Sequence, residues 1–378
     1  MRLRWSWYPV RCYSAGGPPM AVASSRHTVR QWTVNLRSLR RRPVLLFVTV
    51  AAVIGVVTLV VAMWLGGILT QSSYGGLLVG YRPGLTDFGL SASKALVDLA
   101  SAGVIGLLLI RLLLPEQDHK PSPTAQRCLR TATTLALVWA VLGAVLTIFT
   151  WSDVTGFPVM NLPFTKLFTD PVGLYPKVTD YLTVTALALL IAVGIAVTRT
   201  RLGAMVLLPV ALYNLVPLAV QGHRSGDIQI PSLIVHVIAV SLWVGGLAAL
   251  LLHVRGEPEL LAVAVPRFST IALGCYVTIA VTGIIAAYLE FDSLSDLWES
   301  RYGILVMLKA TALITLGALA WWHRRYTVDL IRRQDARARR AFVQLAAAEV
   351  LVMVVAVVLA VALSRTVSPD TGIEHVFE

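Results

Sequence analysis

The residues best suited to bind a metal ion are two histidines, His223 and His236, and one methionine, Met307. Histidine is the commonest metal ligand in proteins, and its imidazole suits copper. A methionine thioether adds a soft ligand of the kind that Cu(I) prefers. These side chains predict a His/Met copper site near one entrance to the protein. The alternatives are a solvated loop position for His223 and, for His236, a hydrogen bond to a backbone carbonyl or to Asp98.

Ionisable side chains inside apolar segments are the second signal, because a charge in hydrocarbon costs about 3 kcal/mol even on a mild scale. Four such residues occur: Asp98, His236, Lys309 and Glu349. With a rise of about 1.5 Å per residue, the first three are expected in one layer of the outer half of the membrane. Lys309 and Glu349 lie on consecutive antiparallel helices. A buried ion pair is expected there, with a role in ion or proton passage as the alternative.

The chain that positions these residues has the composition of a polytopic membrane protein. Of its 378 residues, 57% are hydrophobic and 14% are charged, whereas about a quarter of a soluble domain is charged. A helix needs about 20 apolar residues to cross the hydrocarbon. The sequence therefore predicts an all-α transmembrane helix bundle of about nine spans: 44–69, 94–114, 131–151, 180–198, 202–220, 231–253, 268–289, 302–322 and 341–363.

The basic residues predict how the chain is oriented. They are concentrated in the N-terminal tail and in alternate connections, most strongly in the connection that follows the eighth span. Because Lys and Arg are enriched on the cytoplasmic side, the N-terminus is expected inside and the C-terminus outside. The net charge of +12 therefore indicates a lipid bilayer as the partner, not nucleic acid. The expected regions are a cytoplasmic tail (1–43), an N-terminal transmembrane region (44–179), a second transmembrane domain (180–365) and an outer tail (366–378).

Two spans carry residues that affect their packing. In the sixth span Trp243 is followed by Gly245 and Gly246, and small residues let neighbouring helices approach closely. We expect these three residues to pack this helix and to shape a pathway beside it. The fifth span contains Pro209 and Pro217. Because proline removes a backbone donor, a kink is expected there.

A succession of short motifs resembles the copper resistance protein CopD family. The motifs are QGH before the sixth span, HVIAVSLWVGGL within it, RFSTIALGCYVTIAVTG in the seventh, YGILVMLKATALI in the eighth, and then the helix that carries Glu349. The H-x6-W-x-G-G element is the most specific of them. The resemblance covers residues 180–365 in the order expected for the family. This part of the chain is similar to the CopD half of actinobacterial CopD–CtaG fusion proteins.

The resemblance implies a multi-pass protein of the inner, or plasma, membrane that handles copper. It implies copper uptake, transport or resistance, with a copper ion as the bound metal and no enzymatic activity. A periplasmic or extracellular copper-binding protein and an oxidase-assembly protein are the implied partners. The alternative is an assembly factor or structural subunit linked to the copper supply of cytochrome oxidase.

Other functional classes have less support. The sequence contains no GxxxxGK[ST] loop, so movement of copper would depend on the membrane potential or on a partner. The three cysteines, at positions 12, 128 and 275, form no CxxC pair. A b-type cytochrome would need histidines that face each other across helices. His236 and His253 lie about 25 Å apart on one helix and lack such partners in mid-helix.

Overall fold

The computed structural model describes residues 26–68, 85–116, 122–165, 175–220, 228–291, 293–322, 325 and 336–366. The regular structure in these ranges is helical, and none of them contains a strand. Nine helices in the described ranges are long and apolar enough to cross a membrane, which confirms the predicted all-α bundle. The chain divides into two units, Met1–Val48 and Thr49–Glu378, and the packing described below lies within the second.

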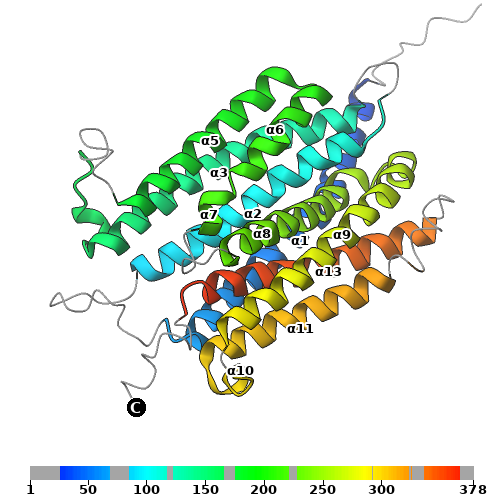
Figure 1. Ribbon diagram of the computed structural model, residues 1–378. Coiled ribbons are helices and arrows are strands. Elements are labelled where there is room, and N and C mark those ends of the chain that lie inside the picture. The colour runs from blue at the N-terminus through cyan, green and yellow to red at the C-terminus, as the bar shows by residue number, and fades with distance from the viewer. Residues whose placement is uncertain are drawn as a thin grey trace, which may run out of the picture. The chain divides into compact units, whose positions relative to one another are not determined.

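The spanning helices lie close to the predicted ranges. Two of them, α2 (Leu85–Leu113) and α9 (Pro258–Glu290), begin well before the predicted spans 94–114 and 268–289, because backbone hydrogen bonding continues past the apolar residues on which the prediction depended. Short elements join or extend the spans: η2 (Val159–Asn161), η3 (Leu250–Val254) and α10 (Asp296–Glu299). The long helices are α1 (Arg26–Leu65), α2 (Leu85–Leu113), α3 (Pro123–Thr155), α5 (Pro176–Thr198), α6 (Arg201–Tyr213) with α7 (Val216–Val220), α8 (Gln229–Ala249), α9 (Pro258–Glu290), α11 (Arg301–Trp322) and α13 (Ala336–Leu363) (Figure 1).

The fifth span is interrupted, as its prolines predict. Pro209 lies inside α6, and α6 ends before a turn that begins at Asn214. Pro217, in α7, has no backbone N–H to continue the helical ladder. The Asn214 side chain is fully buried and donates a hydrogen bond to the backbone carbonyl of Val184 on α5, at 3.1 Å. The break is therefore a fixed feature that joins the fifth span to the fourth.

Helix α2 is the most enclosed of the described spans. In its most apolar stretch 67% of the residues are buried, more than in any of the other eight. It packs against α3, α6, α8 and α13, and Figure 1 shows it between α3 and α8. A helix surrounded in this way by other helices holds its neighbours at fixed separations. The residues that α2 presents to each neighbour therefore decide where any cavity can form.

The tightest packing of α2 is against α8, where glycines remove the side chains between the two backbones. A Cβ atom added to Gly106 would overlap the backbone of Gly245, and one added to Gly245 would overlap the carbonyl oxygen of Ala102. Contacts of this kind bring the axes of two helices closer than larger side chains allow. Gly245 is thus a packing residue between α2 and α8. The adjacent Gly246 faces the Phe268 ring on α9, which a Cβ atom would also overlap.

Polar contacts fix both ends of α2. At its C-terminal end, Arg201 and Arg267 donate hydrogen bonds to the carbonyls of Leu112 and Leu113, at 3.1 and 2.8 Å. The last carbonyls of a helix lack partners within the helix and carry partial negative charge, so these two arginines stabilise the end.

At the other end, Asp87 is 1% exposed and accepts a hydrogen bond from Arg365 at 2.7 Å. Arg365 also lies 3.5 Å from Asp153, which follows the apolar part of α3. Because the three side chains come from α2, α3 and the residues just after α13, their contacts join these elements at one end of the bundle.

We predict that Gly245→Ala destabilises the protein in detergent. The added methyl group must push α2 and α8 apart, and overpacking of this kind typically costs about 1–3 kcal/mol. Thermal unfolding followed by fluorescence should give a lower midpoint temperature than the wild type. A matched control is Gly274→Ala on α9, where a Cβ atom would meet nothing within 4 Å. This control should unfold at the wild-type temperature or slightly above it, because alanine favours the helix. Equal midpoints for the two variants would show that the glycine contact does not limit stability.

Candidate functional site

A cavity of about 410 Å³ lies among α2, α8, α9, α11 and α13. Its lining comes mainly from the first parts of α2, α8 and α11, where it extends past the middle of α8 and α11, and from the last halves of α9 and α13. These helix segments share one half of the bundle, so the cavity extends inward from the end at which α2 begins. Two residues of α7, Leu218 and Ala219, complete the wall.

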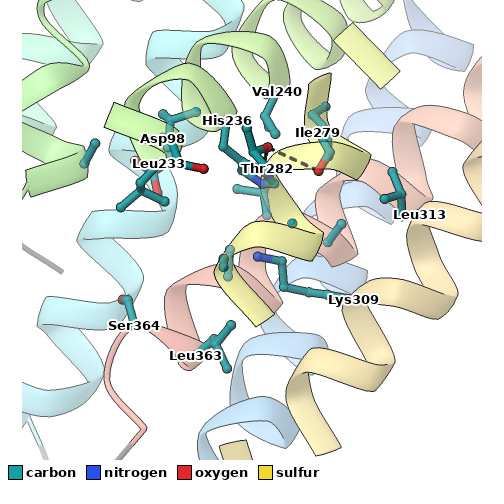
Figure 2. A pocket seen from close by; sticks show the side chains of 18 of the residues that line it. Asp98, Leu233, His236, Val240, Ile279, Thr282, Lys309, Leu313, Leu363 and Ser364 are labelled. Carbon is teal, nitrogen blue, oxygen red and sulfur yellow. Dashed lines mark hydrogen bonds between the residues drawn. The ribbon is translucent and has the colours of Figure 1, made fainter. Parts of the chain in front are cut away.

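Three of the four ionisable residues predicted from the sequence line this cavity. Asp98 contributes from α2, His236 from α8 and Lys309 from α11 (Figure 2). Lys94, which lies one helical turn before Asp98, is a fourth ionisable residue that the sequence did not single out. Most of the other lining side chains are aliphatic. The remaining polar ones are Ser101, Gln229, Ser232, Ser241, Thr282, Tyr302 and Ser364.

His236 is held by a hydrogen bond from α8 to α9. Its Nδ1 atom lies 2.8 Å from the Oγ1 atom of Thr282 on α9. The Thr282 hydroxyl donates its one proton to the backbone carbonyl of Thr278, at 2.7 Å. With its proton directed to that carbonyl, Thr282 Oγ1 accepts a hydrogen bond from Nδ1–H, and the geometry favours this tautomer. In the favoured tautomer Nε2 is the unprotonated nitrogen, and an unprotonated imidazole nitrogen is the form that coordinates a metal.

Lys94 and Asp98 form a local polar group on α2. They lie four positions apart, so they share one face of the helix. The Lys94 ammonium also donates a hydrogen bond to the Ser364 hydroxyl at 3.2 Å, which joins α2 to the residues after α13. Among the described residues, the partner of His236 Nδ1 is the Thr282 side chain, and neither a backbone carbonyl nor Asp98, the two predicted alternatives, is bonded to this nitrogen.

The predicted ion pair between Lys309 and Glu349 is not formed in the described part of the chain, which corrects that expectation. Glu349 is 2% exposed but does not line the cavity. It lies one turn before Met353, and Met353 does line the cavity. The two predicted partners therefore lie at different levels of the bundle, with Lys309 beside the cavity and Glu349 beyond it.

The methionine beside the cavity is not the predicted one. Met307 does not line the cavity and is 37% exposed. It lies two positions from Lys309, and two positions rotate a helix by about 200°, so the two side chains face opposite sides of α11. Met353 on α13 lines the cavity and is 1% exposed. Its position four residues after Glu349 is a sequence signal that could have identified it. His223 lies outside the described residues.

Trp243 lines the inner part of the cavity. It lines the cavity from α8 and packs edge to face against Tyr276 of α9, with ring centroids 5.8 Å apart. Such pairs stabilise a fixed ring orientation. Gly245 and Gly246 follow on the same helix and make the close contacts with α2 and α9 described above. The other histidine of this segment, His253, lies in η3 at the opposite end of the bundle from the cavity, where it is bonded to Thr131 of α3.

The cavity offers few metal donors. Within the described ranges, no three His, Cys, Asp or Glu residues are grouped so that they could hold a metal ion. The donors in the lining are the imidazole of His236, the thioether of Met353 and the carboxylate of Asp98. A structural metal site usually has four protein ligands. The described lining therefore has fewer donors than a closed structural metal site.

Family models match two parts of the chain. Residues 85–227 match the model described as "Copper resistance protein D-like, N-terminal domain", and residues 262–363 match "Copper resistance protein D". The first match begins earlier than the predicted resemblance over 180–365, and α8 lies between the two matches. No curated protein and no solved structure matches the chain significantly. The two matches, in this order along a bundle with nine candidate membrane spans, show that the chain belongs to the copper resistance protein D family, whose members are membrane proteins linked to copper resistance or copper handling.

Proposed function

We propose that this protein transports copper across the membrane, and that the ion binds in the cavity at Nε2 of His236. The observation that carries the proposal is the hydrogen bond between His236 Nδ1 and Thr282, whose geometry favours the tautomer with an unprotonated Nε2. Histidine ligands of metals are commonly held in this way by a second residue, which orients the ring and makes the imidazole a better donor. Copper is the substrate of this site and not a resident cofactor.

The scarcity of donors also supports transport. A site along a transport path must bind the ion strongly enough for entry and weakly enough for release. One imidazole, with Met353 and Asp98 in the same lining, meets this requirement better than a closed set of four ligands would. Since the cavity offers few donors, we propose that a periplasmic or extracellular copper-binding protein delivers the ion to it.

The proposed direction is from the outside toward the cytoplasm of a plasma membrane. The basic residues of the sequence favour an N-terminus inside, and this orientation makes the cavity open outward. A cation that enters a negative interior gains about 2.3 kcal/mol per charge for each 100 mV. The alternative proposal, an assembly factor that passes copper to cytochrome oxidase, would use the same cavity as an acceptor and would not require passage through the membrane.

We predict that His236→Ala weakens Cu(I) binding by at least about tenfold, since a principal ligand is lost. The purified protein is loaded with Cu(I) under reducing conditions, and bound copper is counted by elemental analysis. Uptake is then measured in reconstituted vesicles with an imposed membrane potential, where the variant should be slower by a similar factor.

The matched control for this experiment is His253→Ala, which removes a histidine of the same segment that does not line the cavity. It should bind and transport copper as the wild type does. Unchanged copper binding in His236→Ala would rule out His236 as the ligand. Wild-type protein that binds copper and does not move it into vesicles would instead support the assembly role.

We predict that Thr282→Val weakens copper binding by about tenfold, although Thr282 does not itself contact the metal in this scheme. Valine has nearly the shape of threonine and lacks the oxygen that accepts the Nδ1–H bond. Thr282→Ser keeps this oxygen and should retain the wild-type affinity. Thr270→Val on the same helix removes an exposed hydroxyl that bonds its own backbone, and it should have no effect. Equal affinities for Thr282→Val and the wild type would contradict the proposed role of the hydrogen bond.

A further inference from the structure

The charge of the cavity lining does not match that of a bare copper ion. Among the described residues, the charged side chains of the lining are two lysines, Lys94 and Lys309, and one aspartate, Asp98. In surroundings of low dielectric constant, like charges repel each other far more strongly than they do in water. An excess of lysine therefore opposes the entry of Cu(I) or Cu(II) alone.

The aspartate is associated with only one of the two lysines. Asp98 lies four positions after Lys94 on α2, so the two side chains share a helix face. Lys94 also donates a hydrogen bond to Ser364. Lys94 therefore has polar neighbours on two sides.

Lys309 is in a different situation, across the cavity on α11. In the described part of the chain, its ammonium has no hydrogen-bond acceptor and no carboxylate within 4.0 Å. Figure 2 shows its side chain reaching into the same cavity that His236 and Thr282 border. The lining residues nearest to it on α11 are Val306, Ala310 and Leu313, which are apolar. Lys309 is half-buried, and an ammonium group among apolar side chains is stabilised when an anion lies beside it.

The cavity is also larger than the space that a single metal ion requires. Its volume is about 410 Å³, whereas a water molecule occupies about 30 Å³ in the liquid. Cavities of this size, with apolar walls and a few polar groups, commonly bind small organic molecules. The charge, the size and the small number of donors all fit a second ligand that accompanies the metal.

We propose that copper occupies this cavity together with a small organic carboxylate, which coordinates the metal beside His236 and pairs with Lys309. The carboxylate supplies the donor atoms that the lining lacks, and its negative charge offsets that of Lys309. Its apolar part contacts the aliphatic wall. This inference rests on the proposed function, since it names what is bound together with the copper.

The test uses the purified full chain and radiolabelled butyrate as the probe. The protein is incubated with butyrate, with and without Cu(I), and excess ligand is removed. Copper is counted by elemental analysis and butyrate by its radioactivity in the same sample. The variants are Lys309→Met, which removes the charge, and Lys309→Arg, which keeps it. Lys177→Met is the matched control, because Lys177 is exposed at the start of α5 and does not line the cavity.

In the wild type we expect about one butyrate for each bound copper, and little butyrate when copper is absent. Lys309→Arg and Lys177→Met should behave in the same way, whereas Lys309→Met should bind at least about tenfold less butyrate. Neutral butyramide should not displace the label.

Several outcomes would overturn the inference and leave the proposed function intact. These are copper bound without butyrate, butyrate bound equally without copper, and butyrate retained in Lys309→Met. Wild-type protein that binds no copper would instead contradict the proposed function itself. If Lys309→Met does not yield folded protein, the dependence of butyrate binding on copper in the wild type and in Lys309→Arg decides the question.

Discussion

The contact between the backbones of α2 and α8 is the constraint on which the rest of this structure depends. Gly245 lies against Ala102 and Gly106 with no side chain between them, and this contact sets the separation of the two helices. From this crossing toward the start of both helices, the two helices line the cavity. The glycine contact is thus the reason that Asp98 on α2 and His236 on α8 border one space.

The chemistry of the site follows from the high cost of unpaired polar groups in hydrocarbon. The Thr282 hydroxyl contacts both a carbonyl of its own helix and Nδ1 of His236, so one side chain fixes the position of the imidazole and favours one of its tautomers. Lys94 has Ser364 as a partner. In the described ranges Lys309 has no such partner. Lys309 is therefore the lysine of the cavity whose charge the described lining leaves without a hydrogen-bonded or ionic partner.

The number of helices and the common level of Asp98, His236 and Lys309 could be predicted, because both depend only on hydropathy and on the rise of a helix. The rotation of each helix about its own axis could not. In spans that are apolar on every side, the sequence pattern gives little indication of which face is buried. This is why Met307 was expected beside His236 and Met353 was not. The bond to Thr282 depends on the register between two helices, which a single sequence does not reveal.

The adjacent glycines of α8 also restrict how the protein can move. Gly245 meets α2 and Gly246 meets Phe268 of α9, so turning α8 about its axis would bring side chains into one of these contacts. Helix α11 is less constrained, since only 22% of its most apolar stretch is buried. A conformational change that opens the inner end of the cavity, beside Trp243, would therefore keep α2 and α8 together as one rigid unit. The displacement would occur in α11, and Lys309, the cavity residue that it carries, would move with it.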